Sequence, residues 1–411
     1  MLRYKLLLLP IGIFVALFVP FLYVIPANDG NLEFKFANSW FIGNNRIELL
    51  SLHPPFKLIL FSLFFKLFGY NSIGYIGLIF GIAGIIALYF IAKKLFDKQV
   101  ALLSSILLAT SGQYISVGLF GIHDFLMTVL ILIAFAFYLN SRYLLYTIFI
   151  CIAILTKETA IFFAASILIS DITVKKNVSF VIFAPIVLLA WYVEFLHFSG
   201  YHLWNDWNFS NTAKDGSALT MIYNVVTFQI FNKYALENIL HLFVFNFNWI
   251  YWIFVIVSFF YIKTKEMKKN LIPIGIFAFV FTLLVLTFQT FTINRYILPL
   301  LPFVYMLASY AVFKLKFPSI CISLLLIASF VSLFFSVDPV SNLLWQKTPV
   351  LSENLYLNEL LDGDDGITYN MQYLSLMKER TTRIEKGECG LPPLINNDTL
   401  TLILLNKNTC K

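Results

Sequence analysis

The sequence predicts an all-α polytopic membrane protein with about 11 transmembrane helices, and three observations lead to this fold class. Of the 411 residues, 60% are hydrophobic and only 12% are charged, whereas a soluble domain carries about 25% charged residues. The mean hydropathy is +0.82. The apolar residues form long runs, and the basic residues gather in the short segments between them, as in a chain that crosses a bilayer repeatedly.

The apolar runs define the predicted spans. Residues 6–25 have the length of a bilayer span and lack a small-residue cleavage site, so we expect a retained helix. Residues 54–68 are too short to span, and we expect a helix lying in the outer interface. The short runs 143–156 and 158–171 are two spans or one kinked hairpin turning at Lys157-Glu158. The remaining predicted spans are 72–92, 100–119, 123–140, 178–198, 240–262, 271–290, 296–313 and 317–336.

The basic residues assign a side to each loop. With the N-terminus in the cytoplasm, the inner segments hold 14 basic residues and the longer outer segments only 8, which agrees with the positive-inside rule. The inner set is Arg3, Lys5, Lys93, Lys94, Lys98, Arg142, Lys175, Lys176, Lys263, Lys265, Lys268, Lys269, Lys314 and Lys316. The net charge of +7 therefore reflects topology and does not indicate nucleic-acid binding. We expect a multi-pass protein of the plasma membrane, or of an ER-type membrane in a eukaryote.

This topology divides the chain into a transmembrane domain, residues 1–336, and an extracytoplasmic tail, residues 337–411. The outer loops of the first part are 26–71 and 199–239. The tail alternates turn residues with short apolar runs, which predicts a small α/β subdomain. Cys389 and Cys410 lie there on the oxidising side, where they form a disulfide or remain as thiols. Cys151 and Cys321 lie inside spans, where we expect packed thiols.

Ionisable residues that played no part in assigning the topology also fall on the outer side. Acidic examples are Asp29, Glu33, Asp124 and Glu158, and the histidines are His53, His123, His197, His202 and His241. Ionisable groups at membrane depth are usually functional or face the bundle interior, so we expect one polar cavity open to the outside. The alternatives are solvated loop carboxylates, helix caps and structural histidines. No histidine spacing typical of zinc sites occurs, so no cofactor is firmly implied, although a divalent metal stays open.

The segment Asn294-Arg295-Tyr296-Ile297-Leu298-Pro299-Leu300-Leu301-Pro302 opens a late span on the same side. Its two prolines, three residues apart, should loosen the start of that helix. A guanidinium at this depth requires an anionic partner, and its planar fork matches phosphate oxygens. Arg295 is therefore a candidate phosphate ligand.

Four motifs in this order resemble the GT-C superfamily of glycosyltransferases that use polyprenyl-phosphate sugars. Protein O-mannosyltransferases and lipid A aminoarabinose transferases are the most similar branch. The motifs are Asp29 with His53-Pro54-Pro55-Phe56, Asp124, Leu155-Thr156-Lys157-Glu158, and Arg295-Tyr296 with its two prolines. The resemblance covers about residues 6–315. Gly30 follows Asp29 where the family usually has Glu.

The resemblance implies a GT-C-like bundle with outer interfacial helices that moves a sugar from a polyprenyl phosphate to a hydroxyl of a protein, glycan or lipid. Asp29 would act as base in a single inverting displacement, and Asp124, the second catalytic carboxylate, would orient the neighbours of Asp29 or the sugar. The donor phosphate would be bound by Arg295, Lys157 and His53. Supporting positions would be Glu33, Glu158, Tyr296 and His123. A transporter or flippase of lipid-linked sugars, and an inactive relative acting as an assembly partner, are the alternatives.

Overall fold

The computed structural model describes residues 5–22, 56–68, 72–119, 123–174, 235–244, 247–286 and 294–334, together with a few isolated positions between 183 and 227. These segments are almost entirely helical and contain no strand, in agreement with the predicted fold class. The number of spans stays a prediction. The predicted span 178–198, the loop 199–239 and the tail with Cys389 and Cys410 lie wholly or almost wholly outside the described residues.

The helices follow one another in this order. They are α1 (Lys5–Phe18), the 3-10 turn η2 (Val19–Phe21), α4 (Phe56–Phe68), α5 (Ser72–Leu95), α6 (Lys98–Ala109), α7 (Gly112–Leu119), α8 (His123–Leu139), α9 (Tyr143–Thr156), η4 (Glu158–Ala160), α10 (Ile161–Val174), α14 (Ala235–Phe243), α15 (Asn248–Tyr261), α16 (Lys265–Leu286), η7 (Asn294–Ile297), α17 (Leu301–Val312) and α18 (Pro318–Phe334).

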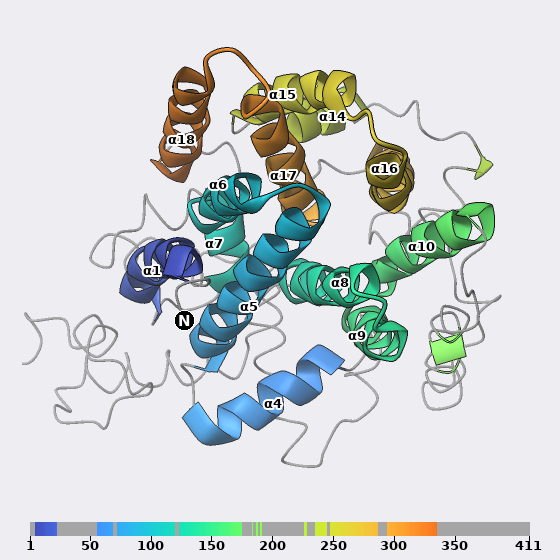
Figure 1. Cartoon of the computed structure of the whole chain (residues 1–411). Coiled ribbons are helices and arrows are strands. Elements are labelled where there is room, and N and C mark those ends of the chain that lie inside the picture. The colour runs from blue at the N-terminus through green and yellow to red at the C-terminus, as the bar shows by residue number, and fades with distance from the viewer. Residues whose placement is uncertain are drawn as a thin grey trace, which may run out of the picture.

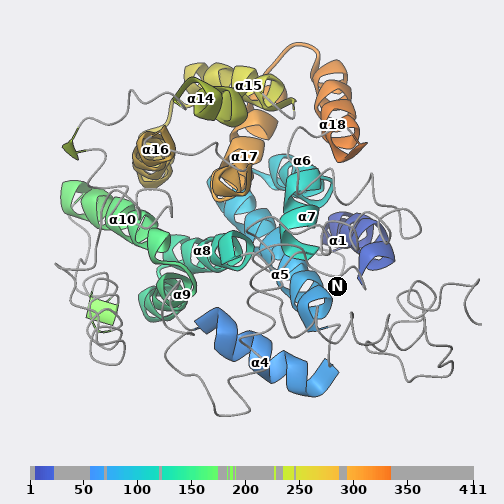
Figure 2. The same ribbon diagram turned by 180° about the vertical axis from the view of Figure 1, so that it is seen from behind.

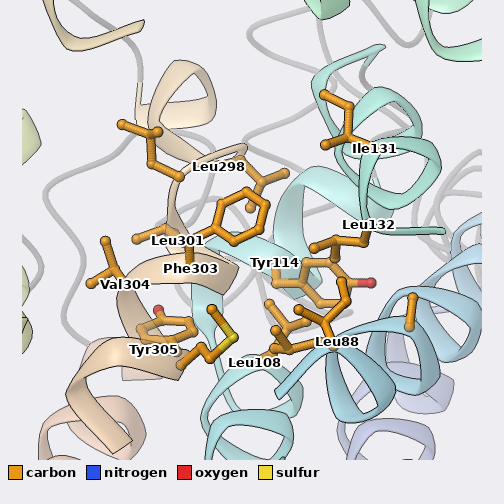
Figure 3. Packing of buried hydrophobic residues seen from close by; sticks show 14 of the residues in the cluster. Leu88, Leu108, Tyr114, Ile131, Leu132, Leu298, Leu301, Phe303, Val304 and Tyr305 are labelled. Carbon is orange, nitrogen blue, oxygen red and sulfur yellow. The ribbon is translucent and has the colours of Figure 1, made fainter. Parts of the chain in front are cut away.

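Helix α5 runs through the middle of the bundle, with α1, α6 and α7 on one side and α8 on the other (Figures 1 and 2). Helix α4 lies along the edge, in contact with α5 and α9. The close-up in Figure 3 shows how side chains of α5 to α8 and α17 meet in one apolar core, among them Leu88, Leu108, Tyr114, Ile131 and Phe303. Helix α8, which carries much of the candidate site, thus shares one core with the three helices before it and with α17, which is distant in sequence.

The outside of the bundle is apolar. Large hydrophobic side chains exposed there include Leu8, Leu67, Leu144, Phe259, Phe260, Phe279 and Ile320. Among the described residues, Gly74–Leu95 and Met267–Leu286 are each long and apolar enough to cross a membrane, and α6 with α7 counts as a third, bent crossing. An apolar surface of this extent is stable against lipid rather than water, so the chain is an integral membrane protein.

The predicted span 100–119 is two helices rather than one. Helices α6 and α7 meet at an angle of 53° around Thr110 and Ser111. The Thr110 hydroxyl lies 2.7 Å from the Ser329 hydroxyl of α18, and the Tyr305 hydroxyl of α17 lies 3.1 Å from Ser111 Oγ. Polar side chains from neighbouring helices therefore surround the backbone at the break, as an interrupted helix at membrane depth requires.

The prediction of one continuous helix over 240–262 is wrong, because α14 ends at Phe243 and α15 starts at Asn248. Phe247 precedes α15 in a left-handed conformation, with φ 63°. The carbonyl of Leu242, exposed by the end of α14, accepts a hydrogen bond from the Trp252 indole at 3.1 Å. This bond stabilises a break that neither Gly nor Pro marks in the sequence.

The two short runs on either side of Lys157 are separate helices, α9 and α10. The hairpin alternative does not hold, because α10 packs on α16 whereas α9 packs along α8. Lys157 is the extended residue between α9 and η4, with φ −153° and ψ 126°. A residue in this conformation ends one helix and lets the next leave in a new direction.

Helix α5 approaches α7 closely enough to require glycine. A Cβ added to Gly77 would lie 2.5 Å from the carbonyl oxygen of Gly118. One turn further on, the Tyr114 hydroxyl donates to the Gly81 carbonyl at 3.0 Å. The glycines of α5 therefore serve helix packing, and they fix α7, which leads directly towards the start of α8.

Candidate functional site

The candidate site lies where four segments meet: the first turn of α8, the junction between α9 and η4, η7, and the first turn of α4. The structure brings together five of the residues that sequence analysis selected. They are His123, Asp124, Lys157, Glu158 and Tyr296.

Asp124 and Lys157 form the centre of this site. Lys157 Nζ donates to Asp124 Oδ1 at 2.7 Å, and both side chains are buried, with exposed fractions of 4% and 2%. Asp124 lies in the first turn of α8, where the helix dipole favours an anion. The backbone N–H of Lys157 donates to the carbonyl of Ala153 at 2.9 Å, which fixes the lysine at the end of α9.

The energetics of this ion pair favour a functional role. At an effective dielectric constant of about 20, two charges at this distance attract by about 6 kcal/mol. Removing each ion from water costs several kcal/mol, so a buried pair adds little net stability over apolar packing. A pair with little effect on stability, enclosed at a helix start, is better explained by what its charges can bind.

Tyr296 covers the ammonium of Lys157. The Lys157 Nζ lies 4.7 Å from the centroid of the Tyr296 ring, within the range of a cation–π contact. The predicted loosening of this helix start is confirmed: η7 covers Asn294–Ile297, residues 298–300 form a turn, and α17 begins only at Leu301. Pro302 occupies the first turn of α17, where a missing N–H group is tolerated.

His123 and Lys57 extend the site towards α4. Lys57 Nζ lies 3.3 Å from His123 Nδ1, and both side chains are buried. An ammonium group can only donate, so Nδ1 is the acceptor and His123 carries its proton on Nε2. The His123 imidazole can therefore donate a hydrogen bond from Nε2.

Sequence reasoning did not select Lys57 as a site residue. This lysine belongs to the run 54–68, for which the sequence predicts an interfacial helix, and lysines on such helices usually extend to the water surface. The available signal was its position two residues after His53-Pro54-Pro55, in the first turn of a largely apolar helix.

Glu158 and Thr159 complete the wall next to Lys157. Both are buried in η4, and the Thr159 hydroxyl donates to Met127 Sδ on α8 at 3.2 Å. This contact fixes the short η4 turn against α8. It keeps the backbone beside Lys157 in a single position.

Several predicted site residues lie outside the described part of the chain. These are Asp29, Glu33 and His53. Arg295 has its backbone in η7, next to Tyr296, but its side chain is outside the described set. Within the described segments, no group of three or more His, Cys, Asp and Glu residues is arranged to hold a metal ion.

The sequence matches a protein-family model over part of its length. Residues 52–204 match the model of the dolichyl-phosphate-mannose-protein mannosyltransferase family. This segment spans α4 to α10 and contains Lys57, His123, Asp124 and Lys157. No curated protein matches the chain by sequence.

Solved structures are similar to this one over nearly its whole length. ArnT from Cupriavidus metallidurans bound to undecaprenyl phosphate superposes with a TM-score of 0.61 at 13% identity, over 98% of this chain and 85% of ArnT. The oligosaccharyltransferase AglB from Archaeoglobus fulgidus, in complex with an inhibitory peptide and a dolichol-phosphate, gives a TM-score of 0.53 at 13% identity. That match covers 90% of this chain and 59% of AglB. At identities this low, the structural similarity shows a shared fold and nothing more.

Proposed function

The chain has the GT-C fold that its motifs predict, and on this premise we propose that it is a glycosyltransferase. It moves a sugar from a polyprenyl phosphate to a hydroxyl group of a protein, glycan or lipid. The reaction takes place on the extracytoplasmic face of the membrane, and the distribution of basic residues in the sequence supports this side.

The observation that carries this proposal is the group formed by the buried Asp124 and Lys157 and the half-buried Tyr296. Three separate sequence motifs supply these residues, and they meet at one end of the bundle within contact distance. A preorganised cation, shielded from water, can stabilise charge that develops on a leaving phosphate. The binding of undecaprenyl phosphate to ArnT and of a dolichol-phosphate to AglB supports a lipid-linked phosphate as the ligand here.

The proposed reaction is a single displacement. The acceptor hydroxyl gives its proton to the carboxylate of Asp29 as its oxygen forms a bond to the anomeric carbon. The bond between this carbon and the phosphate oxygen breaks, and its electron pair leaves with the polyprenyl phosphate. Attack from the face opposite the phosphate inverts the anomeric centre.

Charge stabilisation is the main requirement of this step, because a phosphodiester leaves without needing a proton. Lys157, Arg295 and His53 bind the phosphate in this scheme. Asp124 orients Lys157 through their ion pair, and Tyr296 restricts the same ammonium from its ring face. Removing one preorganised donor of this kind typically lowers the rate by about 100- to 1,000-fold.

Transfer from a labelled polyprenyl-phosphate sugar by the purified protein tests the proposal. We expect Asp29→Asn to abolish transfer, because an amide cannot accept the proton of the acceptor hydroxyl. Asp97→Asn is the matched control: Asp97 caps α6 by accepting from the N–H groups of Gln99 and Val100, a role that Asn also fills. Near-normal transfer by Asp29→Asn would remove this residue as the base.

The same preparation separates enzyme from flippase. If the protein were a flippase, it would move the lipid-linked sugar between leaflets after reconstitution in vesicles, and no new glycosidic bond would form. Movement without product would contradict the proposed function.

A further inference from the structure

Exposed lysines gather at the end of the bundle opposite the candidate site. Helix α17 follows η7, which carries Tyr296, and it ends at Val312, so the segment after it lies at the other end of the bundle. The last turn of α5, the start of α6 and the end of α15 reach the same end, since α6 and α15 both pack along α17. The exposed lysines there form a basic cluster of five residues: Lys94, Lys98, Lys263, Lys314 and Lys316.

Aromatic contacts join the helix ends that carry this basic cluster. The ring of Phe96, between α5 and α6, stacks on the ring of Tyr310 in α17, with centroids 4.3 Å apart. The Tyr310 hydroxyl donates to the carbonyl of Tyr261, the last residue of α15, at 2.9 Å. Lys314 Nζ lies 5.4 Å from the centroid of the same Tyr310 ring. The lysines therefore belong to one built surface rather than to separate loops (Figure 1).

The charges of the basic cluster are not neutralised by the protein. Within the described segments, none of the five lysines makes a salt bridge. The acidic residue described beside them is Asp97, whose carboxylate caps α6 by accepting from the N–H groups of Gln99 and Val100 at 2.8 and 3.0 Å. Like charges gathered on one surface repel one another, so an anion bound there would be stabilised by several ammonium groups at once.

Helix dipoles and topology do not explain the whole arrangement. Lys94 and Lys314 lie at helix C-termini, where the dipole favours a cation, but Lys98 is the first residue of α6 and Lys316 lies just before α18. The positive end of a helix disfavours a lysine. The positive-inside rule accounts for the sign of these residues at this end, but not for their gathering around one pair of stacked rings.

The basic cluster borders an apolar surface. Phe317 and Ile320 at the start of α18 are exposed, and so is Phe260 near the end of α15. Helices α15 and α18 contact each other, so these side chains lie on neighbouring elements of the bundle exterior. A ligand that matches both features is an amphiphile with an anionic head and hydrocarbon chains.

From this arrangement we propose that the basic cluster binds the phosphate of an anionic phospholipid, whose acyl chains lie against Phe317, Ile320 and Phe260. In the predicted topology this end of the bundle faces the cytoplasm, and anionic lipids of that leaflet attract basic residues next to membrane helices. A zwitterionic lipid is less suited, because its own cation would meet the lysines. The lipid takes no part in the sugar transfer, so this inference does not depend on the proposed function.

Binding of phosphatidylglycerol with a fluorescent acyl chain to the purified full-length chain in a neutral detergent tests the inference. We expect the triple variant Lys94→Gln, Lys314→Gln and Lys316→Gln to bind about 10- to 100-fold more weakly, because each basic residue beside anionic lipid contributes roughly a factor of five. The same three residues changed to Arg should keep the affinity within a few fold of wild type. An unchanged affinity of the folded Gln variant would overturn the inference.

A matched control removes the same charge from the same end of the bundle. Arg142→Gln, Lys268→Gln and Lys269→Gln change three basic residues outside the basic cluster, one before α9 and two at the start of α16. Binding of phosphatidylglycerol should stay close to that of the wild type. An equal loss in this control would mean a diffuse attraction by the net charge, which contradicts a site.

Two further ligands define what the surface recognises. Phosphatidylcholine with the same label should bind the wild type and the Gln triple variant equally weakly, and a preference of the wild type for it would contradict the anionic head. The soluble headgroup glycerophosphoglycerol lacks acyl chains and should compete poorly with labelled phosphatidylglycerol. Competition as effective as that of the unlabelled lipid would overturn the lipid assignment.

Thermal unfolding separates lipid binding from packing. The three substituted lysines are exposed, so the Gln triple variant should unfold at the wild-type temperature in detergent alone. Added phosphatidylglycerol should raise the unfolding temperature of the wild type more than that of the variant, because a ligand stabilises the state that binds it. A variant that is destabilised in detergent alone but gains as much from phosphatidylglycerol as the wild type would assign the lysines to fold stability and overturn the inference.

Discussion

A buried carboxylate lies beside each end of α8, one on α8 itself and one on α10, but the partners of these carboxylates differ. At the start of the helix, Asp124 pairs with the ammonium of Lys157. Near the end of the helix, Tyr138 donates its hydroxyl to Asp171 of α10, and the ring of Tyr146 packs against Tyr138 with centroids 5.6 Å apart. In the topology predicted from the basic residues, the first cluster lies on the outer side and the second on the cytoplasmic side.

This difference separates a binding site from a packing contact. A phenol satisfies a hydrogen bond without introducing positive charge, so the Tyr138–Asp171 contact joins α8 to α10 and offers nothing to an anionic ligand. A lysine introduces a charge that a phosphate can share. Under the proposed function, it is therefore the cationic neighbour, and not the buried carboxylate alone, that distinguishes the donor-binding end of this bundle.

Lys157→Met should give the largest effect of any change that tests this contrast. We expect transfer to fall by at least about 100-fold, because a preorganised cation is lost. The unfolding free energy should also fall by about 3–5 kcal/mol, since Asp124 is left buried without its lysine. Initial rates with a labelled donor and thermal unfolding in detergent measure the two effects.

A double variant separates these two effects. Asp124→Asn combined with Lys157→Met removes both charges, so stability should largely return while transfer stays low. Recovery of transfer in the double variant would show that the ion pair serves stability alone.

Tyr296→Leu should have an intermediate effect. It removes the ring beside Lys157 Nζ, and a cation–π contact at a desolvated site contributes about 0.5–2 kcal/mol, or roughly 2- to 30-fold in rate. Tyr296→Phe keeps the ring and should retain most of the activity. Steady-state kinetics on the two variants measure the difference, and equal losses would assign the effect to the hydroxyl rather than to the ring.

Asp171→Asn should have the smallest effect on transfer, less than about threefold, because this cluster lies at the other end of α8. The free energy of unfolding of this variant should nevertheless fall by about 1–3 kcal/mol, because the hydrogen bond from the Tyr138 hydroxyl loses its charged acceptor. Tyr138→Phe should behave in the same way. A loss of transfer as large as that of Lys157→Met would remove the contrast between the two ends of the helix.

Much of the site was predictable because its residues lie at helix ends on one side of the membrane. Asp124 at the start of one run and Lys157 between two others share a side in any topology that follows the basic residues. Their close contact, at 2.7 Å, follows once α8 and α9 pack as antiparallel neighbours. Tyr296 reaches the same place because its motif opens a later run on that side.

Other features were not predictable for physical reasons. The break before Asn248 depends on a left-handed Phe247 and on the Trp252 indole, and an average of hydropathy over this run detects neither. Whether Lys57 points to water or into the protein depends on the partner across α4, and that partner, His123, lies 66 residues later. Side-chain direction on a short apolar helix is decided by tertiary contacts that local sequence does not contain.

The bend between α6 and α7 has a consequence for the biosynthesis of this protein. Its hydroxyl partners, Ser329 and Tyr305, lie 219 and 194 residues beyond Thr110 and Ser111 respectively. Helices α6 and α7 are therefore synthesised long before α17 and α18, whose hydroxyl groups contact the bend. Until α17 and α18 are inserted, we expect this segment to need the translocon or a chaperone to shield its polar groups. Chains truncated before Tyr305 should accordingly be recognised as immature and degraded.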